Sequence, residues 1–273
     1  MSDELSQVVA AEYRSLDALK TRIHAHRHHS ERADDVQQTV LDHSDLNPAH
    51  DVLDAGCGTG DFLRSLTATG HTGRLVGLDS SESAVQAVGR LAGVEAVLGD
   101  AAALPFPNTS FDRVFARHML YHVADPAAAL ESFHRVLRAG GKAIVTVNHE
   151  HTLPNVMTLV REEVRNALGT PESTGLNGVH SDNIAPLMKQ AFGNARLVRI
   201  DNALVFDRPD QLIPFAVAVL SPCGMPADSP AKPAVIDQIA TRIHEWFRTH
   251  EAPWRDPKGY ALCISNREPT PSS

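Results

Sequence analysis

The sequence predicts an α/β fold: a doubly wound, mostly parallel sheet of seven strands with helices on both faces and helical lid insertions. Three observations predict it. Short apolar runs alternate with helical stretches, a glycine-rich turn follows the first run, and acidic residues follow the second and third. Strands that alternate with helices are joined by right-handed crossovers, which place the strands side by side in a parallel sheet.

Each strand is predicted where a short apolar or alternating run is bounded by turn residues. The run over 143–147 is continuously apolar, as expected for a strand covered on both faces. The run over 196–200 alternates between apolar and charged residues instead. The seven predicted strands are 51–55, 74–79, 94–98, 111–116, 143–147, 196–200 and 259–264.

Helices are predicted where apolar residues recur at a spacing of three to four. The first two dozen residues and the stretch 33–46 show this spacing. A later helix has signals at both ends, because Asp125 is placed as its N-cap, Pro126 opens it and Gly140-Gly141 is expected to close it. Shorter helical runs follow the first two strands, and helical or irregular stretches occupy roughly 152–192 and 210–256.

These elements predict a single domain over 1–267, since the late helical segments are embedded between strands. The expected parts are an N-terminal helical lid (1–47), a cofactor-binding core (48–150), helical insertions with the sixth strand on the acceptor side (151–256), the last strand (257–267) and a disordered tail (268–273).

Composition narrows the partners and the compartment. The net charge of −8 argues against nucleic acid and against an anionic membrane surface, which reward clustered Lys and Arg. No apolar run approaches the roughly 20 residues of a membrane span, and the N-terminus lacks the features of a signal peptide. The three cysteines have no paired spacing, so we expect neither a disulfide framework nor a metal site, and a cytoplasmic location.

The glycine-rich turn Gly56-Cys57-Gly58-Thr59-Gly60 excludes two common nucleotide sites. A dinucleotide-binding turn reads G-x-G-x-x-G/A, and Asp61 stands where its third glycine belongs. A phosphate-binding P-loop needs a Lys after its last glycine, and none follows here. The turn alone is weak evidence, because many folds bring backbone close to a ligand in this way.

With its neighbours, the turn resembles a known family. Val52-Leu53-Asp54-Ala55-Gly56-Cys57-Gly58-Thr59-Gly60 is similar to the first motif of the class I S-adenosylmethionine-dependent methyltransferases, in their ubiquinone-biosynthesis-like small-molecule subgroup (methyltransferase type 11). Later segments resemble the same subgroup in the same order over 51–149, including Leu104-Pro105-Phe106-Pro107 and Arg135-Val136-Leu137-Arg138-Ala139-Gly140-Gly141. Ala139 departs from the usual proline. The resemblance implies a Rossmann-like methyltransferase fold with S-adenosylmethionine as cofactor.

The resemblance implies roles for the first strand and the fourth. The glycine turn is expected to lie under the methionine part of the cofactor, with Asp54 serving its ammonium directly or through water. The backbone of Arg117 or its neighbour would also receive the ammonium. The cofactor-binding residues it implies are Asp54, Gly56, Gly58, Gly60, Asp79, Ser80, Asp100, Ala101 and Arg117.

Two further acidic residues are expected to bind the nucleoside part of the cofactor. Asp79 would accept hydrogen bonds from both ribose hydroxyls, and Asp100 would accept one from the adenine amino group. The backbone of Ala101 would contact the adenine ring. Paired hydroxyls are donors and an ionised carboxylate is an acceptor with two oxygens, so the chemistry agrees. Each acid alone has an alternative role as a helix N-cap or a solvated strand end.

Catalytic candidates follow the fourth strand. His118, Tyr121 and His122 are candidates for a general base or a residue that orients the acceptor, with His149 and His151 as weaker ones. In several small-molecule members of the family a His-His pair stands where this chain has Tyr121-His122, so the family role does not carry over directly. Methyl transfer can rely largely on alignment of the reactants, and a base is helpful rather than obligatory.

Four histidines gather near the N-terminus. Helical spacing would put His24 and His28 on one face and His26 and His29 on another, which makes a single metal site awkward. A solvated helix end is the simplest interpretation. The alternative is a lid in which Arg22, Arg27 and a histidine engage an anionic group of the acceptor.

The predicted function is methyl transfer from S-adenosylmethionine to a small molecule at oxygen, nitrogen or carbon. A cyclase or decarboxylase with the same cofactor site, and a non-catalytic cofactor-binding protein, remain alternatives, because function depends on the acceptor site rather than the fold. A dehydrogenase is disfavoured by the glycine spacing. The acceptor is not identified by the sequence, and an amphipathic N-terminal helix would permit a homodimer.

Overall fold

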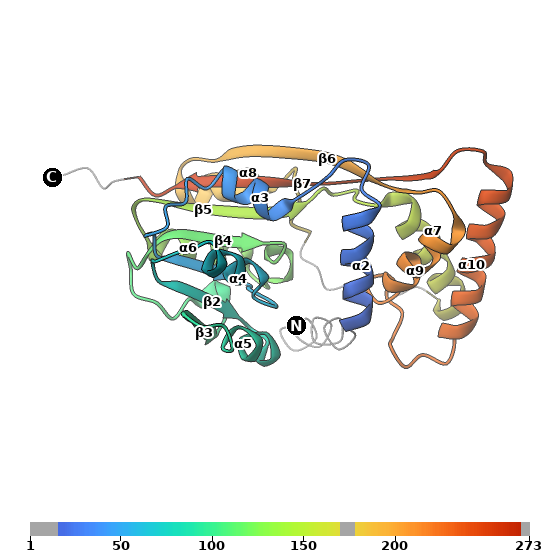
Figure 1. The fold of residues 1–273 in the computed structure, drawn as a ribbon, viewed down its shortest axis with the longest axis horizontal. Helices are drawn as coiled ribbons and strands as arrows, with labels where there is room; N and C mark the ends of the chain where they lie inside the picture. Colours follow the sequence, from blue (N-terminus) through green and yellow to red (C-terminus); the bar gives the residue numbers. More distant parts are fainter. Residues whose placement is uncertain (1–15, 170–177, 269–273) are drawn as a thin grey trace. The chain divides into compact units, whose positions relative to one another are not determined.

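A seven-stranded sheet organises the computed structural model, which describes residues 16–169 and 178–268 (Figure 1). Its strand order is β3-β2-β1-β4-β5-β7-β6. The pairs β1/β2, β2/β3, β1/β4 and β4/β5 are parallel, and β5/β7 is antiparallel, so the predicted fold class is confirmed. The strands are β1 (Val52–Ala55), β2 (Leu75–Asp79), β3 (Val94–Leu98), β4 (Phe111–Arg117), β5 (Leu137–Asn148), β6 (Arg196–Phe206) and β7 (Trp254–Asn266).

The described chain divides into two compact units. The sheet unit comprises 35–150, 178–200 and 260–268, and the helical unit comprises 16–34, 151–169 and 201–259. Two of the unit boundaries fall within β6 and β7, both of which are longer than the strands predicted at 196–200 and 259–264. The role of the helical segments as lids stays a prediction.

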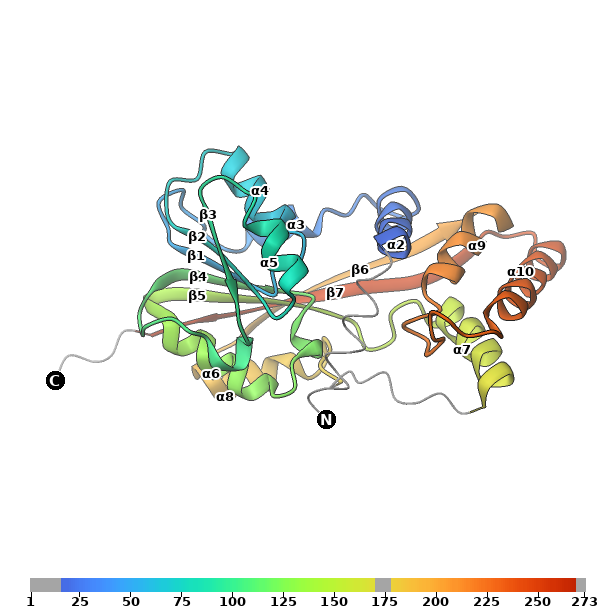
Figure 2. The same ribbon diagram turned by 90° about the horizontal axis from the view of Figure 1, so that it is seen from below.

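Helices cover both faces of the sheet in the sheet unit (Figure 2). One face packs against α6 (Pro126–Val136), α8 (Ile184–Phe192) and η1 (Ala101–Ala103). The other packs against α3 (Val36–Asp42), α4 (Asp61–Ala68) and α5 (Glu82–Val88). Alternate strand residues enter the two cores, as in Val52 and Leu53 of β1. This burial on both faces explains why the strands read as continuous apolar runs.

The helical unit has a core of its own. It is formed by α2 (Leu16–His28), α7 (Pro154–Leu168), α9 (Pro209–Ala218) and α10 (Lys232–Thr249). The aromatic residues Phe206, Phe215 and Trp254 are buried within it. Asp256, itself fully buried, accepts hydrogen bonds from the amides of Asn155 (3.0 Å) and Val156 (2.7 Å), and so satisfies donors at the start of α7.

Two predicted helix boundaries are wrong, and one is confirmed. Asp125 caps α6 by accepting from the amide of Ala128, as predicted, but α6 ends at Val136. Gly140 and Gly141 lie within β5, where their backbone groups pair with Arg267. The helix expected over 33–46 shortens to α3, because the Asp35 carboxylate accepts from the amide of Gln38 and starts the helix there.

The N-terminal predictions are tested only in part. A helix is present over 16–28, and the earlier part of the predicted helix lies outside the described residues, as do 269–273 of the predicted tail. The homodimer through this helix therefore stays a prediction. Among the described residues, no helix combines the length and the apolarity that crossing a membrane requires.

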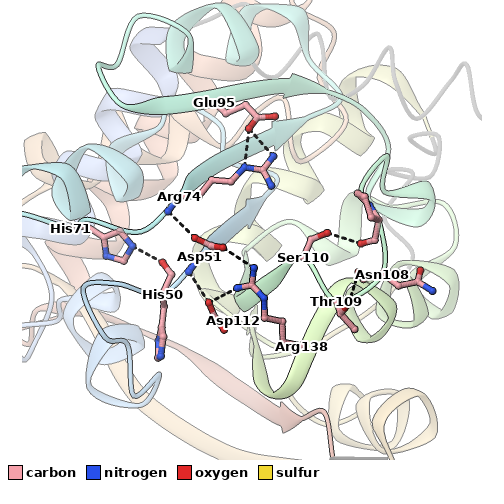
Figure 3. Close-up of polar contacts among 11 residues, drawn as sticks. His50, Asp51, His71, Arg74, Glu95, Asn108, Thr109, Ser110, Asp112 and Arg138 are labelled. Atoms are coloured by element: carbon pink, nitrogen blue, oxygen red, sulfur yellow. Dashed lines mark hydrogen bonds and ion pairs between the residues drawn. The ribbon is translucent and has the colours of Figure 1, made fainter.

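A charged network joins the amino ends of four neighbouring strands (Figure 3). The guanidinium of Arg138 on β5 donates to Asp112 Oδ2 on β4 (2.6 Å) and to Asp51 Oδ2 just before β1 (2.7 Å). Asp51 also accepts from the amide of Arg74 before β2 (2.9 Å). These contacts fix the start of each strand at the edge opposite the glycine turn.

We predict that Arg138→Gln lowers the free energy of unfolding by about 1–2 kcal/mol, a value reduced for solvent screening because the side chain is 39% exposed. Burial alone would raise the pKa of Asp51, but hydrogen bonds and charges from Arg138 and Arg74 outweigh it and lower the pKa. The contribution is therefore present above about pH 4 and lost as pH falls through the folded-state pKa.

Urea unfolding of wild type and variant at pH 7 and pH 3 measures both effects. Arg90→Gln, at an exposed position after α5, is the matched control and should change stability by less than about 0.5 kcal/mol. Equal stability of Arg138→Gln and wild type at pH 7 would contradict this account of the network.

Candidate functional site

The strand order reverses between β1 and β4. From β1 the chain proceeds outward through β2 and β3, and then returns to the other side of β1 with β4 and β5. In open sheets of this kind, ligands bind in the crevice beyond the carboxyl ends of the strands at such a reversal. The glycine turn 56–60 leaves the carboxyl end of β1 and leads directly into α4.

The glycine turn is held in left-handed backbone conformations. Gly58 has φ +52° and Gly60, the N-cap of α4, has φ +75°. A Cβ built on Gly60 would lie 2.8 Å from Val88 Cγ2, so this glycine is needed for packing. A Cβ built on Gly58 meets no atom within 4 Å. The space beside the Gly58 backbone is therefore open, and the ligand contact expected there stays a prediction.

Asp79 lies beside this turn. It closes β2, is half-buried, and its two carboxylate oxygens accept from the amides of Gly58 (2.9 Å) and Ser81 (3.0 Å). A carboxylate has about four acceptor positions, so two remain for the donors of a ligand such as paired hydroxyls. Ser80 is exposed next to it.

Asp100 and Ala101 follow β3. Asp100 is exposed, and one carboxylate oxygen accepts from the amide of Ala102 (2.9 Å), so Asp100 is the N-cap of η1. This is the alternative role considered for an acid at this position, and it leaves the second oxygen for a donor. Ala101 is buried in the core under α6.

Asp54 and Arg117 form a buried ion pair that the sequence analysis missed. Asp54 is fully buried on β1, and Arg117 at the end of β4 donates to it from Nη2 (2.9 Å) and, over a longer distance, from Nε (3.4 Å). The guanidinium lies 4.3 Å from the centroid of the Phe62 ring. Burial raises the pKa of Asp54, and the Arg117 charge and hydrogen bond offset part of that rise.

The three catalytic candidates lie together in the sheet unit, immediately after β4. His118 has φ +52°, which is uncommon for a residue with a side chain, and its amide donates to the carbonyl of Thr146 (2.9 Å). Tyr121 and His122 belong to η2 (Leu120–His122), with ring centroids 4.6 Å apart. All three side chains are half-buried. Backbone held in a left-handed conformation is often found where function constrains it.

The weaker candidates fall in different units. His149 follows β5 in the sheet unit, whereas His151 belongs to the helical unit. In the sheet unit, Glu150, His180 and Asp182 place one ligand atom each within 4.8 Å of one another, a grouping not foreseen in the sequence. Arg199 pairs with Asp182 (2.6 Å), and two of the three residues are exposed, so we assign no metal to them.

The N-terminal histidines group differently from the prediction. The rings of His24 and His28 lie 4.3 Å apart, as helical spacing predicts. The predicted pairing of His29 with His26 is wrong, because α2 ends at His28. The centroid of the His29 ring lies 6.5 Å from that of His24 and 4.9 Å from that of Phe206. His26 instead faces Phe215, with its Nδ1 3.3 Å from Lys258 Nζ. The acceptor-binding role of this helix stays a prediction.

Comparison with known proteins finds a matching family and several relatives. The family described as "Methyltransferase domain" matches residues 53–145. A demethylmenaquinone methyltransferase from Staphylococcus epidermidis is 36% identical over 120 residues, which are 42% of this chain and 50% of the relative. The chain spans about half the length of the demethylmenaquinone methyltransferases that it matches.

Solved structures share the fold at low identity. A candidate methyltransferase from Bacillus halodurans is 16% identical with a TM-score of 0.58, and the match covers 86% of this chain and 99% of that chain. The [4+2]-cyclase SpnF is 21% identical with a TM-score of 0.53, over 86% of this chain and 81% of that chain. The fold is therefore found both in a cyclase and in a candidate methyltransferase.

We predict that Gly58→Ala and Gly60→Ala separate ligand binding from stability. At Gly58 the added methyl has room, so the loss of stability is limited to the left-handed strain of about 1–2 kcal/mol. The methyl would meanwhile intrude on any ligand there, and cofactor affinity should fall at least tenfold. Gly60→Ala adds a clash with Val88, for a total of about 2–5 kcal/mol.

Thermal unfolding and ligand titration of both variants test this pair. The Gly58 variant should remain folded with weakened binding, and the Gly60 variant should be the less stable. Undiminished affinity in Gly58→Ala would mean that no ligand passes over this turn.

Proposed function

We propose that this chain, whose residues 53–145 form a methyltransferase domain of the class I S-adenosylmethionine-dependent kind, transfers a methyl group from that cofactor to a small-molecule acceptor. The observation that carries the proposal is the pairing of the open Gly58 backbone with the Asp79 carboxylate at the strand reversal. Both the site chemistry and the family match support it.

The residues at the carboxyl ends of β2 and β3 fit the cofactor. Its adenosine part offers paired hydroxyl donors, for which Asp79 retains acceptor capacity, and an exocyclic amine, for which Asp100 retains one oxygen. A positively charged sulfonium suits strand ends that carry carboxylates such as Asp79 and Asp100, whereas a phosphate would need the cationic cradle of a P-loop. Gly58 supplies the close backbone approach that a bound nucleoside derivative needs.

The chain's own residues would bind the cofactor, orient the acceptor and accept a proton from it. When bound, the cofactor supplies a methyl group on a sulfonium, which is an excellent leaving group. Asp79 and the glycine turn would hold the donor in place, and alignment of donor and acceptor can contribute about 7–11 kcal/mol in favourable systems. His118, Tyr121 or His122 would accept a proton or orient the acceptor, a contribution of roughly 10²- to 10⁴-fold where a proton must leave.

The net charge of the chain bears on the class of acceptor. Acidic charge disfavours nucleic acid, so we propose a small molecule methylated at oxygen, nitrogen or carbon. The described cysteines are buried and unpaired, which favours a reducing, cytoplasmic setting. A cyclase reaction remains the alternative because a solved cyclase has this fold, and formation of S-adenosylhomocysteine with a turned-over acceptor distinguishes methyl transfer from it.

We predict that wild type binds S-adenosylmethionine with micromolar affinity and that Asp79→Ala weakens binding at least tenfold. The reason is the loss of a charged acceptor for two ribose hydroxyls, each such bond being worth about 1.5–3 kcal/mol. Isothermal titration calorimetry measures both constants. Asp79→Asn should give an intermediate value, because an amide keeps one acceptor oxygen but loses the charge.

Glu95→Gln is the matched control. Glu95 is an exposed acid on the adjacent strand β3 whose partner is Arg74 (2.7 Å), so the variant should bind as wild type does. A folded wild type that binds no cofactor, or an Asp79→Ala variant with unchanged affinity, would contradict the proposed site.

A further inference from the structure

The buried ion pair between Asp54 and Arg117 bridges the two strands at the reversal. Asp54 aligns with Phe115 in the β1/β4 register, so Arg117, two residues further along β4, lies on the same face and beyond the end of β1. The Asp54 side chain is completely buried, and that of Arg117 is 19% exposed. A ligand approaching these strand ends from beyond the sheet would therefore meet the guanidinium before the carboxylate.

The Asp54 oxygens are already engaged. Oδ2 accepts from Arg117 Nη2 at 2.9 Å, and Oδ1 lies 3.4 Å from Nε. A ligand ammonium that contacted Asp54 directly would have to displace Arg117 and bring a second cation to one buried carboxylate. Breaking a buried pair in this way leaves an uncompensated charge, which costs several kcal/mol.

Arg117 has donors to spare. A guanidinium carries five N–H groups, and within residues 16–169 and 178–268 its hydrogen-bond partner is Asp54 alone. The Phe62 ring lies against the guanidinium, 4.3 Å from its central carbon. On the neighbouring strand, Thr146 is in register with Arg117 and fully buried, and its hydroxyl has no hydrogen-bond partner among the described residues. Buried polar groups usually have a hydrogen-bond partner, so this hydroxyl is available to an ordered water or a ligand.

We propose that Arg117 binds the carboxylate of the methionine end of the cofactor, and that Asp54 acts through Arg117 by holding its guanidinium in place rather than by contacting the ammonium. A planar fork of N–H donors suits a carboxylate. Arg117 is then a specificity-determining residue, and Asp54 is a positioning residue. This inference rests on the proposed function, since it concerns the same cofactor.

Decarboxylated S-adenosylmethionine is the probe, because it keeps the nucleoside, the sulfonium and the ammonium and lacks only the carboxylate. Calorimetric titration of both compounds gives a preference ratio for each protein variant. We expect wild type to prefer S-adenosylmethionine about 30-fold, the equivalent of roughly 2 kcal/mol for a charge-assisted contact.

The decisive variant is Asp54→Asn/Arg117→Gln. Both charges are removed together, so no uncompensated charge is buried, and the two amides can still hydrogen-bond. We expect its preference ratio to fall below about threefold, while its affinity for the decarboxylated compound stays within a few-fold of wild type. If this variant does not fold, Arg117→Lys takes its place: it keeps a cation beside Asp54 but loses the fork, and the ratio should fall at least fivefold.

Three results overturn the inference. A double variant that keeps the wild-type preference would show that Arg117 serves only to neutralise Asp54. A wild type that binds both compounds equally would overturn the role of Arg117 and leave the proposed function intact. A wild type that binds neither compound would overturn this inference together with the proposed function, so the two failures are distinguishable.

Discussion

The ion pair between Asp54 and Arg117 joins β1 to β4 where the order of strands reverses. A carboxylate that is completely buried needs a cation beside it, because burial without one strongly disfavours the charged form. Arg117 provides that cation from the neighbouring strand. The glycine turn, the first turn of α4 and the segment that carries the catalytic candidates all leave the sheet within a few residues of this pair.

Charged side chains have different partners at the two ends of the parallel strands. At the amino ends, Arg138 pairs with Asp51 and Asp112, and these partly exposed ion pairs fix the strand starts. At the carboxyl ends, Asp79 and Asp100 accept hydrogen bonds from backbone amides and keep acceptor capacity. Paired charges at the amino ends support stability, whereas the acids at the carboxyl ends keep oxygens available for the cofactor that we propose.

Much of the fold could be predicted from the sequence, because its parallel strands are buried on both faces and read as short apolar runs. The glycine turn and the acids at the strand ends also follow from local sequence. The Asp54–Arg117 pair could not be predicted this way, since its members are 63 positions apart and meet only through the β1/β4 register. The place of Arg117 two residues beyond the buried Phe115 was the available signal, but it needs the strand pairing to be interpreted.

Two other predictions were wrong because local sequence did not determine the structure. Gly140-Gly141 resembles a helix end, yet its backbone pairs with Arg267 near the end of the described chain, a contact that local sequence does not encode. His29 follows helical spacing from His26, yet the helix stops one residue before it. In both cases a partner distant in sequence, or the end of an element, determined the outcome rather than local propensity.

A crystal structure of the protein with S-adenosylhomocysteine bound would test the proposed cofactor site most directly. We expect the ribose hydroxyls to lie within about 3.2 Å of the Asp79 carboxylate, with the glycine turn beneath the amino-acid end of the ligand. A ligand bound elsewhere, or one bound at this edge without contact to Asp79, would contradict this expectation.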